Sequence, residues 1–261
     1  MSKIAWLHFD YITKGETENL AQITAGIHLA AENGAVYILT PELAVQGYHF
    51  TQQGKPYVIH TDLCALLQPV LQAAAKRRVW IFLGCAMRDA KDGQPHNSCL
   101  VISPDGYIVG RHDKHLIHAP AEAWSVAGTT NDCFDCDGTR IGVLVCADAW
   151  YDENGAALQQ LGAEAVVLSA AWPPGCGGPP ENAWERCSRA SGGKPVLVCN
   201  QTGFDGRMDC RIAMSAVILQ GKLTLSYVSP QPAILLADMD FSTGMLAQHA
   251  FTVLPWDEGP R

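Results

Sequence analysis

The sequence predicts an α/β sandwich in which mixed sheets lie inside and helices lie outside. Apolar runs of strand length alternate with stretches of helical period along the chain, and hairpin turns join some of the strands. Hydrophobic residues make up 48% of the chain and charged residues 17%, which is typical of a compact globule. A chain of 261 residues can bury one large core, and no low-complexity linker interrupts it. We therefore expect one domain that spans residues 1–261.

Strands and helices alternate through the first half of the chain. Apolar residues recur at a helical period in two stretches, and Gly34 ends the first of them. The sequence Ser103-Pro104-Asp105-Gly106 is a turn signal between two apolar runs, which predicts a hairpin. The predicted elements are a strand that begins near Met1, helices at residues 18–33 and 63–77, strands at residues 36–39 and 79–85, and a hairpin at residues 98–109.

The second half begins with a long predicted loop at residues 115–131 and then repeats the alternation. One apolar run ends at Cys146, and another, at residues 165–169, predicts a fully buried strand. Gly221 lies between two further strand-like runs and predicts a closing hairpin. The remaining predicted elements are a helix that begins at residues 156–161, a helix at residues 183–192, a strand at residues 195–200, and hairpin strands at residues 215–219 and 223–228.

Cys146 has the sequence surroundings of a nucleophile. It ends the apolar run at residues 141–146 and precedes the polar segment at residues 147–153. A thiol at the exit of a buried strand is held in one position while one side stays open, as attack on a substrate carbon requires. A buried structural cysteine is the alternative, and it applies to most of the 10 cysteines in this chain. The motifs described next favour the catalytic interpretation for Cys146.

Two other predicted strand ends carry the charged groups that a thiol nucleophile needs. Pro41 ends a strand directly before Glu42, and the second strand of the hairpin ends at Lys114. Strand ends at one edge of a sheet can converge on a single cleft. There Cys146 would attack, Glu42 would take up and return protons, and Lys114 would stabilise developing negative charge. The backbone N–H of Ala147 is a candidate second donor. Taken singly, Glu42 and Lys114 could instead be ordinary surface charges.

The order of these motifs resembles that of the nitrilase superfamily, the carbon-nitrogen hydrolases. Members have a Pro-Glu strand end, a Lys followed by His-Leu, and a strand-borne Cys followed by an acidic residue two places on. The matching residues are Pro41-Glu42 with Gly47-Tyr48, Lys114-His115-Leu116, and Cys146-Ala147-Asp148 with Glu153, and further matches extend from Asn19 to Asp240. The resemblance implies a four-layer α-β-β-α sandwich in which two sheets pack face to face.

The resemblance also implies further residues of the site. A glutamate in the loop after the Lys-His-Leu motif is here Glu122, which would hold Lys114 and orient the substrate, with an ordinary loop acid as the alternative. Four residues are candidates to line a substrate pocket, and each could instead be a core or turn residue: Tyr48, Trp124, Trp172 and Asn200. Arg207 and Arg211 could bind a substrate carboxylate, although surface arginines are the more common case. We expect no metal and no organic cofactor, because the thiol itself carries the acyl group.

These residues predict hydrolysis of the non-peptide C–N bond of a small linear amide through a cysteine acyl-enzyme. Many nitrilases proper have Trp-Glu after the nucleophile, whereas this chain has Ala147-Asp148, which favours amides over nitriles. The segment at residues 150–153 lacks the Arg and Pro that many amidases and carbamoylases have there, so the family does not identify the substrate. The alternatives are a nitrile or ureide (N-carbamoyl) hydrolase or an acyl transferase with the same nucleophile, and a catalytically silent scaffold or binding protein on the same fold.

Composition and the N-terminal segment limit the classes of partner and the cellular location that we expect for this protein. The formal net charge of −8 disfavours nucleic acid and anionic membrane surfaces as partners, and no apolar run reaches the length of a membrane span. The chain starts directly in a strand-like run without the features of a secretory signal, so we expect a cytoplasmic protein with reduced cysteines. The resemblance implies a homodimer or higher homo-oligomer, and the Trp150-Tyr151 pair just after Cys146 would suit an aromatic-rich contact.

Two motifs could suggest a metal site. Cys133 and Cys136 have the spacing of half a zinc site, but no second half follows them in the sequence. Three histidines lie close together at positions 112, 115 and 118, and their spacing suits an exposed loop better than a preformed metal cage. Neither motif therefore changes the expectation of a metal-free enzyme.

Overall fold

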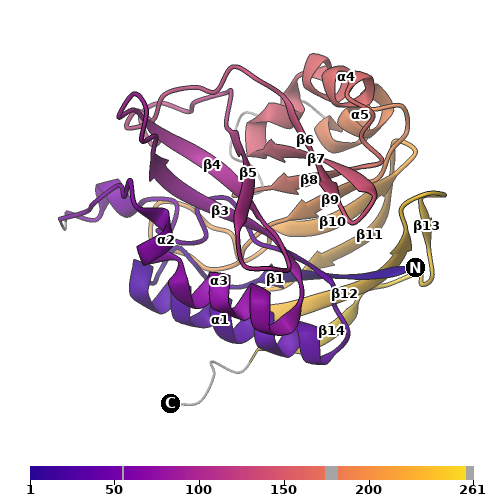
Figure 1. The fold of residues 1–261 in the computed structure, drawn as a ribbon, viewed down its shortest axis with the longest axis horizontal. Helices are drawn as coiled ribbons and strands as arrows, with labels where there is room; N and C mark the ends of the chain where they lie inside the picture. The colour runs from indigo at the N-terminus through magenta and orange to yellow at the C-terminus, as the bar shows by residue number, and fades with distance from the viewer. Residues whose placement is uncertain (55, 174–181, 257–261) are drawn as a thin grey trace.

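The computed structural model describes residues 1–54, 56–173 and 182–256, and these form two β-sheets with helices on their outer sides (Figure 1). The strands of the larger sheet are β1 (Ser2–His8), β2 (Tyr37–Leu39), β3 (Trp80–Arg88), β4 (Pro95–Ile102), β5 (Ile108–Asp113), β12 (Ala233–Asp240), β13 (Met245–Leu246) and β14 (Thr252–Pro255). Their order is β13-β12-β1-β2-β3-β4-β5, and β14 also pairs with β12.

The smaller sheet has six strands in the order β11-β10-β9-β8-β7-β6. Their bounds are β6 (Asp132–Cys136), β7 (Thr139–Val145), β8 (Ala165–Ser169), β9 (Val196–Cys199), β10 (Met214–Leu219) and β11 (Lys222–Val228). The strands at the centre of each sheet are parallel, with β1, β2 and β3 together in one sheet and β7, β8 and β9 together in the other. Helices connect these parallel strands, so their carboxyl ends lie at a common edge of each sheet.

Helices cover the outer face of each sheet. Their bounds are α1 (Glu16–Glu32), α2 (Leu63–Leu66), α3 (Gln68–Arg77), α4 (Asp152–Gln160) and α5 (Ala183–Ala190), with short 3-10 helices η1 (Phe50–Gln52) and η2 (Cys146–Trp150). Figure 1 shows α1 and α3 side by side below the larger sheet and α4 and α5 together beside the smaller one. The order of layers is therefore helix, sheet, sheet, helix, which confirms the predicted four-layer sandwich.

Among the described residues, three apolar layers lie against the sheets because the central strands are buried on both faces, and a fourth apolar cluster includes Leu43, Tyr48 and Phe50. In β1, Ala5 and Leu7 contact the layer under α1 and α3, whereas Ile4 and Trp6 contact the layer between the two sheets. Strands that bury both faces read as continuous apolar runs, as these do. A third layer lies between the smaller sheet and its helices and includes Leu158 of α4. The alignment of the two packed sheets sets the positions of their strand ends relative to each other.

Some elements differ from the sequence-based predictions. The predicted helix at residues 63–77 is two helices, because Pro69 lacks the N–H that a continuous helix would need there. The run that ends at Cys146 belongs to β7, the second strand of a hairpin whose turn is Asp137-Gly138, both with positive φ. The first strand of this hairpin, β6, was not predicted. The predictions also omitted β12, β13 and β14. No helix among the described residues is both long and apolar enough to cross a membrane.

Candidate active site

Cys146 lies where β7 leaves the smaller sheet, as the first residue of η2. Its backbone has a φ of 49°, in the left-handed region that a residue with a side chain rarely adopts. Such a conformation costs about 1–3 kcal/mol and persists only where the surroundings impose it. The residue is buried and 6% exposed. The sharp turn therefore ends the strand at the thiol and keeps a small part of the residue accessible.

Three charged side chains meet beside Cys146. Glu42 follows β2, Lys114 follows β5, and Glu122 lies in the loop after β5, and all three are fully buried. The Lys114 ammonium nitrogen is 2.7 Å from Oε1 of Glu42 and 2.5 Å from Oε1 of Glu122. The Cys146 thiol hydrogen-bonds the Glu42 carboxylate. The structure thus brings together all four residues that the sequence suggested for catalysis.

Asn97 and Ala171 complete the surroundings of Glu42, and the sequence analysis missed both. The Asn97 side-chain amide donates to Oε1 of Glu42 at 2.7 Å, and the Ala171 N–H donates to Oε2 at 3.1 Å. The Ala171 N–H also hydrogen-bonds the Cys146 thiol. The sequence did not single out Asn97, because it precedes the predicted hairpin at residues 98–109 and lies between the polar residues His96 and Ser98. No signal existed for Ala171, which acts through its backbone.

Glu122 is engaged through both of its carboxylate oxygens. Its Oε1 accepts a hydrogen bond from the Tyr48 hydroxyl at 2.5 Å in addition to that from Lys114, and its Oε2 accepts the backbone N–H of His118 at 3.1 Å. Tyr48 therefore belongs to the site as a partner of Glu122. These contacts orient Glu122 so that it holds the ammonium group of Lys114 against Glu42.

Burial and neighbouring charge set the protonation of the site. Burial raises the pKa of Glu42 to about 7, against the opposing effect of Lys114. Burial and the Glu42 carboxylate raise the pKa of the Cys146 thiol well above its ordinary value. Burial alone would lower the pKa of Lys114, but Glu42, Cys146 and Glu122 together raise it. The resting site therefore holds a neutral thiol, a charged lysine and a carboxyl group that can exchange protons near neutral pH.

Gly84 allows the turn that carries Glu42 to lie against the larger sheet. It lies in β3, next to the end of β2, and a Cβ atom there would lie 2.1 Å from the carbonyl oxygen of Pro41 and 3.0 Å from the Cα of Glu42. Real Cβ atoms do not approach backbone so closely. Only glycine at this position leaves room for the backbone on either side of Glu42.

The aromatic candidates lie around this centre in different ways. The ring of Trp124 packs on Phe50 with centroids 5.1 Å apart, and the ring of Trp172 lies 5.9 Å from that of Trp150. Asn200 is fully buried, and its amide is bonded to the backbone N–H and C=O of Trp172 at 3.2 and 3.0 Å. Asn200 therefore holds the backbone of Trp172 in place.

Asp148 turns away from the thiol. Its carboxylate accepts the N–H groups of Val145, His115 and Leu116 and contacts a ring nitrogen of His112. The Asp148 carboxylate is therefore committed to the scaffold. The side chain of Ala147 is small and fully buried.

Other residues that the sequence analysis considered lie outside the centre. The side chains of Arg207 and Arg211 are 47% and 54% exposed, and Arg211 is paired with Asp209. Cys133 and Cys136 pack into different core layers on the two faces of β6, so they do not face a common ligand. The expectation that the three histidines form an exposed loop was wrong for His112, which is fully buried in β5.

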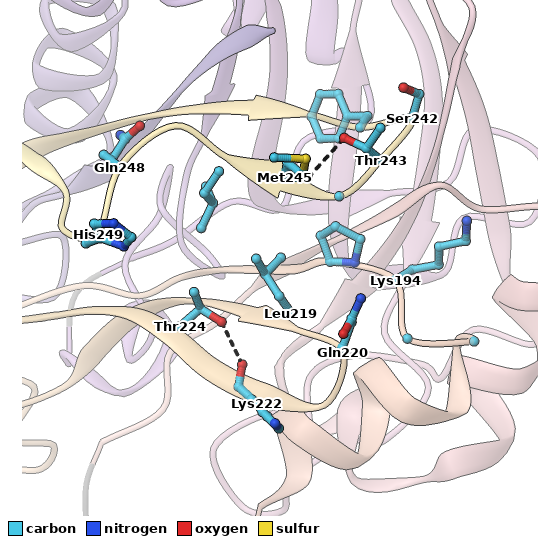
Figure 2. Close-up of a pocket in the computed structure, with 16 residues that line it drawn as sticks. Lys194, Leu219, Gln220, Lys222, Thr224, Ser242, Thr243, Met245, Gln248 and His249 are labelled. Carbon is cyan, nitrogen blue, oxygen red and sulfur yellow. Dashed lines mark hydrogen bonds between the residues drawn. The ribbon is translucent and has the colours of Figure 1, made fainter.

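A separate pocket of about 710 Å³ lies between the β10–β11 hairpin and the turn that joins β12 to β13 (Figure 2). Its lining contains no cysteine, aspartate or glutamate, and so it offers neither a thiol nucleophile nor a carboxylate base. Figure 2 shows Lys194, Lys222 and His249 on different sides of the pocket, without convergence on one point. This pocket therefore lacks the groups that the site around Cys146 brings together.

Comparison with known proteins identifies the family. The family model for carbon-nitrogen hydrolases matches residues 8–243. The chain is 27% identical to a citrullinase of Francisella tularensis subsp. tularensis over 213 residues, which cover 74% of this chain and 72% of that protein. It is 33% identical to an (R)-stereoselective amidase of Pseudomonas sp. over 103 residues, 40% of this chain and 36% of that protein. It is 25% identical to an N-carbamoylputrescine amidase of Solanum tuberosum over 209 residues, 73% of this chain and 68% of that protein.

Solved structures show the same fold. An amidase from Nesterenkonia sp. AN1 superposes with a TM-score of 0.79 at 20% identity, covering 92% of this chain and 94% of that one. Nit3 of Saccharomyces cerevisiae, a member of the nitrilase superfamily, superposes with a TM-score of 0.76 at 18% identity, covering 93% and 92%. The family match spans most of the sequence, and the architecture agrees with it. This chain therefore belongs to the carbon-nitrogen hydrolase family.

Proposed function

We propose that this protein hydrolyses the C–N bond of a small linear amide through an acyl-enzyme on Cys146, releasing a carboxylic acid and ammonia or an amine. The observation that carries the proposal is the buried Lys114 ammonium group between Glu42 and Glu122, with the Cys146 thiol hydrogen-bonded to Glu42. This arrangement offers a nucleophile, a proton carrier and a fixed positive charge within one site.

The first half of the reaction uses Glu42 as a base and then as an acid. Glu42 takes the thiol proton as the Cys146 sulfur attacks the amide carbon. The C–N bond then breaks, and the protonated Glu42 gives its proton to the leaving nitrogen, which leaves a thioester on Cys146. A carboxyl group whose pKa is about 7 can perform both transfers near neutral pH, because its two protonation states have similar free energies there.

Lys114 is placed to stabilise the negative charge that develops on the carbonyl oxygen. A lysine ammonium group has three N–H donors, and Glu42 and Glu122 accept two of them. The third donor is available for the oxyanion, and the backbone N–H of Ala147 is a candidate second donor. Glu122, held by Tyr48, keeps the ammonium group from rotating away.

The second half returns the enzyme to its starting state. A water molecule attacks the thioester carbon while Glu42 takes one of its protons. The C–S bond then breaks, the sulfur recovers a proton from Glu42, and the carboxylic acid leaves. In sum, one amide and one water give one acid and one amine or ammonia, and the thiol is regenerated.

Ureides are the second candidate substrates. Two relatives that match about three quarters of this chain have names of this kind, the citrullinase and the N-carbamoylputrescine amidase. A ureide would form a carbamoyl thioester on Cys146, and the same residues would serve. Acyl transfer to an amine in place of water, or attack on a nitrile, would likewise begin at the same sulfur.

The test is ammonia release across a panel of amides, ureides and nitriles, together with the intact mass of the protein trapped during turnover. We expect an acyl adduct on the native protein, no adduct and no ammonia with Cys146→Ala, and native activity with the control Cys64→Ala, which removes an exposed thiol. In a mutant of the Nesterenkonia amidase, acrylamide has added to the active-site cysteine of that protein. Ammonia release retained by Cys146→Ala would overturn the mechanism, and a native protein inactive on the whole panel would favour the silent scaffold.

A further inference from the structure

His112 joins the two sheets next to the candidate active site. It lies in β5 of the larger sheet and is fully buried. Its Nδ1 is 3.2 Å from a carboxylate oxygen of Asp132, in β6 of the smaller sheet, and its Nε2 is 3.0 Å from a carboxylate oxygen of Asp148, in η2. The ring, on the strand that precedes Lys114, therefore contacts both β6 of the smaller sheet and η2, the 3-10 helix that begins at Cys146.

The geometry indicates which protonation state the ring has. A neutral imidazole has one N–H, so it could donate to only one of the two carboxylates and would face the other with a lone pair. A protonated ring donates to both. Burial disfavours the charged form, but Asp132 and Asp148 outweigh it and raise the pKa of His112 to about 9. Two other titratable groups bear on the pair, the ring of His115, centred 5.1 Å from that of His112, and Lys114, whose charge acts on Asp148.

Asp148 in turn fixes both catalytic strand ends. One of its oxygens accepts the N–H groups of His115 and Leu116, the two residues after Lys114, at 2.9 and 3.2 Å. The other accepts the N–H of Val145, the residue before Cys146, at 3.0 Å, as well as His112. Asp148 has no exposed surface, so without a cation beside it this carboxylate would be a buried charge with only neutral donors.

We propose that protonated His112 is a positioning residue, which holds Asp148 ionised and thereby fixes the distance between the Lys114 ammonium group and the Cys146 thiol. The activity readout of this proposal rests on the proposed function. Neutralising His112 removes the charge that keeps Asp148 in place, and the two strand ends, which belong to different sheets, lose their shared anchor. A displacement of the reacting groups by about 1 Å can cost about a hundredfold in rate.

The first test measures the ring itself and needs no substrate. Imidazole nitrogen chemical shifts of the ¹⁵N-histidine-labelled native protein are recorded at pH 8, with His112→Gln used to assign the signals. We expect both nitrogens of His112 to carry protons at this pH, where a solvent-exposed histidine is neutral. A neutral His112 at pH 8 overturns the proposal, whatever the enzyme hydrolyses.

The second test follows the pH dependence of kcat/KM on the best substrate of the panel. Asp132→Asn removes one of the two carboxylates beside His112, at a position whose side chain is 29% exposed. We expect nearly native kcat/KM at pH 6.5 and an alkaline fall that begins at least about one pH unit lower than in the native protein, because His112 loses its proton more easily. An unchanged alkaline limb in Asp132→Asn overturns the proposal.

The third test is His112→Gln, with His28→Gln on α1 as the control. We expect a folded variant whose kcat falls about a hundredfold while KM changes by less than about threefold, and a control with native values. The rate at which iodoacetamide alkylates Cys146, followed by mass spectrometry, should fall as well, because that reaction needs Glu42 and Lys114 in place beside the thiol. A kcat within twofold of native in folded His112→Gln overturns the proposal. If the native protein hydrolyses nothing, the proposed function fails, and the ring protonation and the alkylation rate still decide the role of His112.

Discussion

Asn97 donates its side-chain amide to Oε1 of Glu42 at 2.7 Å, and its own backbone carbonyl accepts the N–H of Lys114 at 2.8 Å. The same Glu42 oxygen also accepts the Lys114 ammonium group. One residue near the start of β4 thus contacts both the Glu42 carboxylate and the backbone of Lys114. Because Asn97 lies on a strand, its position is rigid, and the two groups are held at a fixed separation.

Replacement of Asn97 should move the acidic limb of the pH profile. A donor to the carboxylate favours its ionised form, so Asn97→Leu should raise the pKa of Glu42 further above about 7, the value to which burial already raises it. The ionised base then exists only at higher pH, and kcat/KM at pH 6.5 should fall about tenfold, with partial recovery at pH 8.5. The measurement is kcat/KM from pH 5 to 9. Asn97→Asp should shift the acidic limb in the same direction and further, since it adds a negative charge beside Glu42. Acidic limbs that coincide in the native protein, Asn97→Leu and Asn97→Asp would refute the role of Asn97.

Glu42→Gln should remove most of the turnover and little of the substrate binding. Glutamine keeps the shape and can still accept from Lys114, but it cannot take the thiol proton. We expect kcat to fall by about three orders of magnitude or more with KM changed less than about fivefold. Glu122→Gln is the matched comparison, because its amide oxygen can still accept from both Lys114 and Tyr48, so its loss should be smaller. A twofold loss in Glu42→Gln would show that the proton carrier is another group.

Gly84→Ala should damage the site from the neighbouring strand. The added methyl group would lie 2.1 Å from the carbonyl oxygen of Pro41, so the turn that carries Glu42 must shift. We expect a loss of stability of about 2 kcal/mol or more by urea denaturation, as for overpacking in a rigid core, and a fall in kcat in the fraction that stays folded. Gly15→Ala is the control, since its Cβ would have an ordinary contact of 3.6 Å. Native stability in Gly84→Ala would contradict the prediction and show that the backbone at Glu42 can move to make room for the methyl group.

Amides should be hydrolysed at least about tenfold better than nitriles of the same acyl group, a difference of roughly 1.4 kcal/mol in transition-state stabilisation. The leaving nitrogen of an amide accepts a proton from Glu42 in the first half-reaction, whereas a nitrile gives a thioimidate that must add water before ammonia leaves. Of the two residues after the thiol, only Ala147 remains to influence this step, because Asp148 is bound to the scaffold. The comparison is kcat/KM for one acyl group in both forms. Equal or better nitrile turnover would refute the amide preference and leave the Cys146 mechanism intact.

Self-association is expected through the surface beside the nucleophile strand. Tyr151 is 50% exposed directly after η2, whereas Trp150 packs inward against His118 and Trp172. We therefore propose that Tyr151 supplies the aromatic contact in a homodimer or higher homo-oligomer. Sedimentation velocity at micromolar concentration should show a species larger than one chain, and Tyr151→Asp should shift it towards the monomer. A native protein that sediments as a strict monomer would contradict the proposal.

The sequence by itself suggested Cys146, Glu42 and Lys114 as the reacting groups, because the order of their three motifs resembles that of the nitrilase superfamily, and the structure brings the three side chains together. Helix and strand positions were also largely predictable, since periodicity depends on neighbours along the chain. The exceptions were two local signals that went unused, Pro69 and the Asp137-Gly138 turn, and the strands β12, β13 and β14, which were not predicted. The identity of Glu122 came from the family resemblance, and the structure placed it on Lys114.

Only the tertiary structure decided how these groups are held. Asn97 reaches Glu42 because β4 lies next to β3 in the larger sheet, and His112 meets Asp148 because two separate sheets pack with one particular alignment. Such contacts join residues far apart in the sequence, and no local pattern records which strands become neighbours. The sequence therefore suggests the reactive groups, whereas the pairing of the strands and the packing of the two sheets set the distances and the protonation states on which the proposed chemistry depends.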